Sequence, residues 1–201
     1  MRDRKPGAAW EEFYEATAGR MPRRTLLKAL DEFGLLAGRA VDLGCGDGRD
    51  TVEMLRRGWS VIAVDAEPRA LERLKARSDL PPAAKLTILL GAFQDERVAW
   101  PAADLINASF SLPLCPPASF PVLWRKIAAS LGAGGRFAGQ LYGDRDGWAD
   151  RRDLTIFDGT SAHRLFDGYA LELFEEEESD TVTPRGKPKH WHIFHIVARK
   201  R

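Results

Sequence analysis

The chain has 201 residues, of which 44% are hydrophobic and 29% charged, and its formal net charge is +1. This length and balance suit one globular domain with a sizeable core, so we expect residues 1–201 to form a single domain. A charge so close to zero gives no global field that would attract nucleic acid or a membrane surface, and we expect neither as a partner. No apolar run reaches the roughly 18 residues that a membrane helix needs.

The cysteines and the N-terminus indicate the compartment. There are two cysteines, Cys45 and Cys115, without a paired spacing that would bind a metal, and they argue against a disulfide framework. Residues 1–9 are polar and basic and lack the apolar centre of a signal peptide. We therefore expect a cytoplasmic protein, as a monomer or a weak homodimer.

The first 35 residues are predicted to form two helices, at 8–17 and 24–33, with Gly34 after the second. Trp10 and Tyr14 are four residues apart and therefore share one face of the first helix. Two interpretations stay open: the pair packs on the core, or it forms part of a lid over a ligand.

Short apolar runs then alternate with helical segments, which is typical of an α/β fold with a mostly parallel sheet. The last third differs, with a polar loop, a short helix at 162–166 and a hairpin of two long strands at 169–178 and 190–199, joined by 179–189. We expect a Rossmann-like, seven-stranded, mostly parallel sheet with an antiparallel last strand and helices on both faces. The five earlier strands are expected at 40–43, 60–64, 86–90, 104–109 and 136–142, and the helices between them at 51–57, from 67 onward, and at 122–131.

Three glycines, Gly44, Gly46 and Gly48, follow the first strand directly and precede a helix. Such a turn lets the backbone approach a ligand and presents free helix N–H groups. Asp65 ends the second strand 21 positions after Gly44, where a carboxylate can accept both hydroxyls of a ribose. A nicotinamide fingerprint would have glycine or alanine where Arg49 stands, so a nicotinamide-dependent oxidoreductase is the less favoured alternative.

The segment 41–50, Val-Asp-Leu-Gly-Cys-Gly-Asp-Gly-Arg-Asp, resembles the first motif of class I S-adenosylmethionine-dependent methyltransferases. Its Gly-Cys-Gly-x-Gly-Arg-Asp form is most similar to the tellurite-resistance-like bacterial branch. The resemblance extends to 58–65, 131–137 and 189–192. It implies an enzyme that transfers a methyl group from S-adenosylmethionine to a small-molecule acceptor and releases S-adenosylhomocysteine. The alternative is a non-catalytic protein that binds the same cofactor.

The resemblance also implies roles for individual residues. Asp42 would hold the cofactor's α-amino group, directly or through water, and Asp65 the ribose. The stretch 91–93 would meet the adenine, although the acidic residue that many relatives carry near Ala92 is missing here. Residues 107–109 would lie where the methyl group points, and Arg20 is a candidate partner for the cofactor carboxylate. The expected cofactor-binding residues are Trp10, Tyr14, Arg20, Asp42, Gly44, Cys45, Gly46, Gly48, Asp65, Ala66, Ala92, Phe93, Asn107 and Ser109.

The acceptor side is less well specified. Ligands of open α/β sheets bind at the carboxyl ends of the strands, so residues 143–168 are expected to border the acceptor site. No catalytic base stands out, and the candidates are His163, His192 and Tyr142. His190 and His192 should share one strand face and His195 the other; we expect no metal, because a third ligand with suitable spacing is missing. The acidic run 175–178 is interpreted as a solvated strand end.

Overall fold

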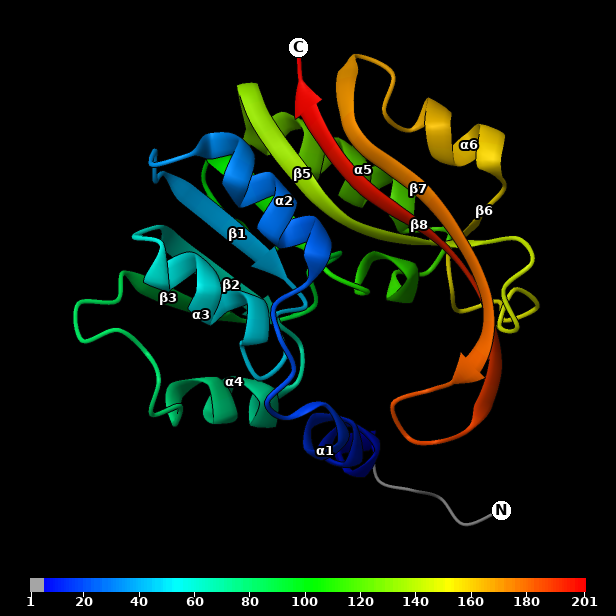
Figure 1. The fold of residues 1–201 in the computed structure, drawn as a ribbon, viewed down its shortest axis with the longest axis horizontal. Coiled ribbons are helices and arrows are strands. Elements are labelled where there is room, and N and C mark those ends of the chain that lie inside the picture. The colour runs from blue at the N-terminus through cyan, green and yellow to red at the C-terminus, as the bar shows by residue number, and fades with distance from the viewer. Residues whose placement is uncertain (1–5) are drawn as a thin grey trace.

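The computed structural model describes residues 6–201 and shows one mixed sheet flanked by helices (Figure 1). The strand order is β3-β2-β1-β4-β5-β8-β7, with β6 beside β5. Strands β1 to β5 run parallel, and β8 is antiparallel to both of its neighbours, as the sequence predicts. The strands are β1 (Arg39–Leu43), β2 (Ser60–Asp65), β3 (Leu86–Leu90), β4 (Ala103–Ala108), β5 (Leu131–Gly143), β6 (Ile156–Phe157), β7 (Tyr169–Val182) and β8 (Pro188–Lys200).

Helices cover both faces of this sheet, because its buried strands present apolar side chains on both sides. Leu105 of β4 packs with the helices of one face, and its neighbour Ile106 packs with those of the other. The first face carries α2 (Arg24–Phe33) and α3 (Arg49–Arg56), and the second carries α5 (Phe120–Ser130) and α6 (Gly159–Arg164). The remaining helices are α1 (Pro6–Thr17), α4 (Pro68–Lys75) and a short 3-10 helix, η1 (Leu112–Leu114). None of the helices described is long and apolar enough to cross a membrane.

Two differences from the sequence-based expectation concern the last third. The hairpin strands are longer than predicted, because Thr181 pairs with Lys189 and Val182 with Pro188, so only residues 183–187 form the turn. Turn-forming residues therefore do not mark the strand ends here: Pro188 occupies the last paired position of a ribbon edge, which a proline tolerates. The two-residue strand β6 was not expected from the sequence, and it adds a parallel partner to the end of β5.

Candidate active site

The glycine loop connects β1 to α3 at the carboxyl edge of the sheet. β1 and β2 pair in parallel, which brings the loop next to Asp65 at the end of β2. The Gly46 N–H donates to Oδ2 of Asp65 over 2.8 Å, and the Glu67 N–H donates to Oδ1 over 2.8 Å. These two bonds fix the orientation of a half-buried carboxylate, and burial raises its pKa above the usual range. Asp65 therefore lies beside the loop, where the sequence predicts an acidic partner.

The three loop glycines have different neighbours, although all three have positive φ angles, between 57° and 86°. A Cβ on Gly48 would lie 2.2 Å from Cδ1 of Leu74, and one on Gly44 would lie 2.5 Å from Cβ of Ser111. These two positions need glycine for packing within the protein. A Cβ on Gly46 would instead meet the ring of Tyr14 at 3.2 Å.

A buried polar cluster lies behind the loop. Asp42 is 2% exposed and accepts hydrogen bonds from Thr51 Oγ1 and from Asn107 Nδ2, the latter over 2.8 Å. Burial, together with the nearby carboxylate of Asp50, raises the pKa of Asp42 to about 7. The Ser109 hydroxyl donates to Oδ1 of Asn107 over 3.3 Å. Each carboxylate oxygen of Asp42 thus accepts a hydrogen bond inside the protein, and Asn107 links Asp42 to Ser109 after the end of β4.

Helix α1 covers the loop. The Tyr14 side chain is 4% exposed, and Trp10 stacks on it with ring centroids 6.3 Å apart. Arg73 of α4 lies 5.9 Å from the Tyr14 ring and forms an ion pair with Glu11, which fastens α1 to α4 (Figure 1). Burial and the nearby Asp65 raise the pKa of the Tyr14 hydroxyl. Tyr14 thus lies over the glycine loop, in the place that a lid would take.

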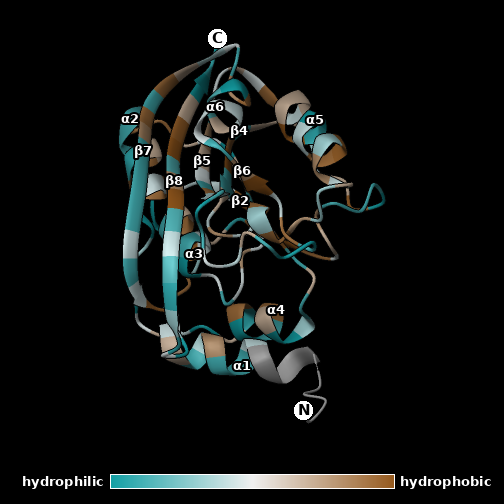
Figure 2. Cartoon of the chain, turned by 90° about the vertical axis from the view of Figure 1, so that its right-hand side faces the viewer, coloured by the Kyte–Doolittle hydropathy of each residue, from teal (hydrophilic) through white to brown (hydrophobic). Residues whose placement is uncertain are grey.

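A cleft of about 1190 Å³ lies on the other side of α1. It is bounded by α1, the segment after β4, the end of β5 and the β7–β8 hairpin. Figure 2 shows this hairpin reaching from the sheet to α1, with a hydrophilic outer half. Ligand pockets commonly measure about 300–1,000 Å³, so the cleft has room for a molecule larger than a single ring. Its aromatic lining consists of Trp10, Phe13, Phe110, Tyr142, Trp148 and Trp191.

Phe110 occupies an unusual position in this lining. Within the described part of the chain, it is the non-glycine residue with a positive φ, 56°. Its N–H donates to the Gln140 side chain over 3.0 Å, and the guanidinium of Arg23 lies 4.3 Å above its ring. A left-handed conformation costs a bulky residue roughly 1–2 kcal/mol, and such strain gathers at functional sites. Nothing in the sequence marked Phe110, apart from its place close behind β4, which ends at Ala108.

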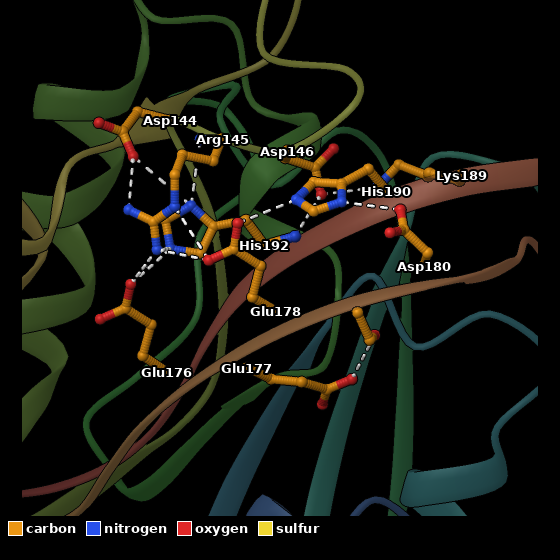
Figure 3. A network of polar contacts seen from close by, with 11 residues as sticks. Asp144, Arg145, Asp146, Glu176, Glu177, Glu178, Asp180, Lys189, His190 and His192 are labelled. Atoms are coloured by element: carbon orange, nitrogen blue, oxygen red, sulfur yellow. Dashed lines mark hydrogen bonds and ion pairs between the residues drawn. The ribbon is translucent and has the colours of Figure 1, made fainter.

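The acidic run 175–178 forms part of the cleft wall. These side chains are exposed, as expected, but they lie within β7 rather than at its end. Arg145 donates to Glu176 and Glu178, and His192 also contacts Glu176 over 2.8 Å (Figure 3). Glu177 pairs with His195, and Glu175 with Arg24. Each acidic side chain is thus paired with an arginine or a histidine from a part of the chain that is distant in the sequence.

The three candidate bases have different surroundings. Tyr142 lines the cleft, but burial raises its pKa, so its hydroxyl stays protonated at neutral pH. His192 faces away from the cleft and is fully buried; its Nδ1 accepts from the Arg145 N–H, and its Nε2 bonds Glu176. His163 is exposed on α6 and packs on the Phe174 ring, with centroids 4.8 Å apart. Neither His163 nor His192 lines the cleft, whereas His195 does.

The remaining expected residues lie in the cleft, beside the glycine loop, in the core or at the surface. Trp10 and Arg20 line the cleft. Phe93 lies beside the loop, 3.6 Å from the position that a Cβ on Gly44 would take. Cys45 is buried with Leu71 and Leu74, so the loop reaches a ligand through its backbone there. Ala66 is exposed and Ala92 is half-buried.

Residues 40–135 match the family model described as a methyltransferase domain. The match covers just under half of the 201 residues, and this part of the chain is similar to a methyltransferase domain. The matched segment contains the glycine loop, Asp65 and the ends of β3 and β4, whereas α1, the end of β5 and the β7–β8 hairpin lie outside it.

Two curated relatives share parts of this domain. An uncharacterised methyltransferase of Synechocystis sp. is 32% identical over 100 residues, which are 50% of this chain and 45% of that protein. The magnesium-protoporphyrin O-methyltransferase of Rhodobacter capsulatus is 50% identical over 44 residues, which are 22% of this chain and 19% of that protein. The matches therefore span less than half the length of either relative.

Solved structures share the fold over nearly the whole chain. TehB from Haemophilus influenzae superposes with a TM-score of 0.75 at 13% identity, covering 96% of this chain and 67% of that one. The 1,6-didemethyltoxoflavin-N1-methyltransferase of Burkholderia thailandensis gives 0.69 at 19% identity, covering 100% and 92%. The hairpin and the N-terminal helices are thus included in the structural likeness, which at these identities concerns the fold.

Proposed function

We propose that this protein transfers a methyl group from S-adenosylmethionine to a small-molecule acceptor bound in the cleft, leaving S-adenosylhomocysteine. The observation that carries the proposal is the arrangement around α1. Its Tyr14 covers the glycine loop of the methyltransferase domain, while its Trp10 and Phe13 line the adjacent cleft. The same helix thus covers the glycine loop, where the cofactor would bind, and borders the cleft, where the acceptor would bind.

The residues present fit this cofactor. Asp65 is held with its carboxylate at the loop and would accept the ribose hydroxyls, and Phe93 would flank the adenine. Arg23 has a buried Nε without a hydrogen-bond partner among the described residues, and burial lowers the pKa of its guanidinium to about 10. A carboxylate would satisfy that donor, so Arg23 joins Arg20 as a candidate partner for the methionine carboxylate. Asp42 would act on the amino group through Asn107 or water.

When bound, the sulfonium supplies a methyl group that is already activated for in-line displacement. The protein then has to align the acceptor and exclude water. Trp10 and Tyr14 would cover the bound cofactor and present aromatic ring faces to its positive sulfur. The cleft, with its aromatic lining, would orient the acceptor beside residues 107–109 at the end of β4.

The named acceptors of the relatives support a small molecule, since they are magnesium protoporphyrin and 1,6-didemethyltoxoflavin. Nucleic acid is not expected as a partner, because the net charge is +1. The proposal further includes a single domain over residues 1–201, a monomer or weak homodimer, and a cytoplasmic location.

Calorimetry with S-adenosylmethionine, S-adenosylhomocysteine and NAD tests the cofactor. We expect the two sulfur ligands to bind with micromolar affinity, about −8 kcal/mol, and NAD not to bind. Release of S-adenosylhomocysteine across a panel of phenols, aromatic amines and thiols then tests for transfer. Binding of NAD without binding of either sulfur ligand would overturn the proposal. Binding of both sulfur ligands without turnover of any acceptor would instead favour a non-catalytic binding protein.

A further inference from the structure

His195 is a titratable group in the cleft that the proposed function does not yet use. It lies on β8, with Gln140 of β5 and Glu175 of β7 as its cross-strand neighbours. Trp191, Ile193 and His195 alternate along β8, and all three line the cleft. The His195 residue is 9% exposed, so its ring is largely removed from bulk water.

Hydrogen bonding defines which ring nitrogen of His195 is free. Nε2 lies 2.9 Å from Oε2 of Glu177, whose other oxygen accepts from the Ser179 hydroxyl over 3.2 Å. A carboxylate is an acceptor, so Nε2 carries the proton and Nδ1 is left with a lone pair. None of the residues described donates to Nδ1. His192 differs, because both of its nitrogens are already bonded within the protein.

The ring of His195 lies near the segment that follows β4. The ring of His195 meets that of Phe110 edge to face, with centroids 6.3 Å apart. Phe110 follows β4 after one intervening residue, Ser109, and its ring centroid lies 6.4 Å from that of Tyr142. An acceptor lying against Phe110 would thus be close both to the end of β4 and to His195.

We infer that His195, oriented by Glu177, is the general base for an acceptor that presents an O–H or N–H on a planar ring bound against Phe110 and Tyr142. This inference rests on the proposed function. The acceptor proton moves to Nδ1, and a lone pair on the acceptor oxygen or nitrogen forms the new bond to the methyl carbon. The carbon–sulfur bond breaks, and its electron pair stays on sulfur. The Glu177 carboxylate stabilises the imidazolium, which releases its proton to water when the product leaves.

Charged and titratable groups surround His195. Glu175 and Glu177 of β7 face it, with Glu175 in an ion pair with Arg24, and Arg23 and Tyr142 lie around the neighbouring Phe110 ring. The base must be neutral at the start, so the rate of transfer to a hydroxyl should rise with pH as the imidazolium loses its proton. An acceptor that is already anionic should not show this dependence on His195.

Nitrogen NMR of the histidine rings tests the geometry without turnover. We expect the Nε2–H tautomer for His195, and Glu177→Gln should change its ring nitrogen signals. The matched control is Glu178→Gln, one residue away, which pairs with Arg145 and His190 instead. Titration with 2-naphthol in the presence of S-adenosylhomocysteine should shift the Nδ1 signal. An Nδ1–H tautomer, or a Glu177→Gln spectrum unchanged at His195, would overturn the inference.

Turnover tests the role as a base. For His195→Gln we expect a loss of about 10²–10⁴-fold in kcat with 2-naphthol but a far smaller loss with thiophenol, which is ionised at pH 8. The control His190→Gln, on the face of β8 opposite to that of His195, should behave like the wild type with both probes. Calorimetry should give His195→Gln an unchanged affinity for S-adenosylhomocysteine.

The outcomes separate the two proposals. A wild type that binds no S-adenosylhomocysteine would refute the proposed function. A wild type that methylates both probes, with equal losses for both or no loss in His195→Gln, would refute only the general base. If neither probe is methylated, an Nδ1–H tautomer of His195, or ring signals that do not respond to Glu177→Gln, would still refute the general base, whereas the Nε2–H tautomer with a response would support it.

Discussion

Replacing Tyr14 would separate two ways in which α1 can aid cofactor binding. The Tyr14 side chain is only 4% exposed without ligand and already lies over Gly46. Because the ring is buried both before and after binding, hydrophobic burial contributes little to the difference between the two states. The attraction between the ring face and a positive sulfonium remains, about 0.5–2 kcal/mol. We therefore expect Tyr14→Ala to weaken S-adenosylmethionine binding by roughly 2- to 30-fold.

The comparison of two ligands makes this prediction specific. S-adenosylhomocysteine has a neutral thioether and lacks the attraction, so Tyr14→Ala should weaken its binding much less. Calorimetry of the wild type, Tyr14→Ala and the control Tyr14→Phe, which keeps the ring, measures both affinities. Equal losses for the two ligands would refute contact with the sulfonium, and no loss for either would mean that the helix only packs. Hydrogen exchange of residues 10–17 with and without S-adenosylhomocysteine shows whether binding also orders α1.

Three further outcomes are expected. Asp65→Ala should weaken S-adenosylhomocysteine binding about ten- to a hundredfold, because about 1.5–3 kcal/mol of hydrogen bonding is lost; an unchanged affinity in the folded variant would contradict the role in ribose binding. Lys189→Met leaves the buried carboxylate of Asp146 without its cation and should lower the free energy of unfolding, measured in urea, by about 3–5 kcal/mol. The double variant Lys189→Met with Asp146→Leu should lose less stability, and equal losses would argue against a role of the ion pair. Burial raises the pKa of Asp42, so the folded state binds that proton more tightly than the unfolded state, and the resulting stabilisation should decline as pH rises from about 4 to 7. Urea unfolding across this range measures the decline, and Asp42→Asn with a wild-type slope would contradict its origin.

The part of the fold around the glycine loop could be predicted because its sequence signals are local. A buried strand, a glycine turn and a helix follow one another within 41–56, and Asp65 ends the adjacent parallel strand. The parallel pairing of β1 with β2 then brings the loop and the carboxylate together without any distant contact. Helix and strand ends differed by a few residues, as at α3, which begins at Arg49 directly after the left-handed Gly48.

The part of the fold around the cleft could not be predicted to the same extent, because its contacts join residues that are distant in the sequence. Alternation along β8 predicted that His192 and His195 face opposite sides, but the curvature of the hairpin determines which side meets the cleft. The positive φ of Phe110 accompanies a hydrogen bond from its N–H to the Gln140 side chain, thirty residues away. A sequence pattern carries neither kind of information.

The outer part of the β7–β8 hairpin is held by fewer strand pairings than the parallel sheet. Toward its outer end β8 pairs with β5 only as far as Ile193 opposite Tyr142; beyond that pair, β8 bonds to β7 and to the loop after β5, where the Gly147 N–H donates to the His190 carbonyl. An isolated two-stranded ribbon is marginally stable in water, so this part depends on anchors such as the bond between Lys189 and Asp146. Local opening should therefore admit and release the acceptor while the parallel sheet stays intact. Substitutions in the turn 183–187 can then reshape the acceptor wall over evolutionary time without disturbing the glycine loop.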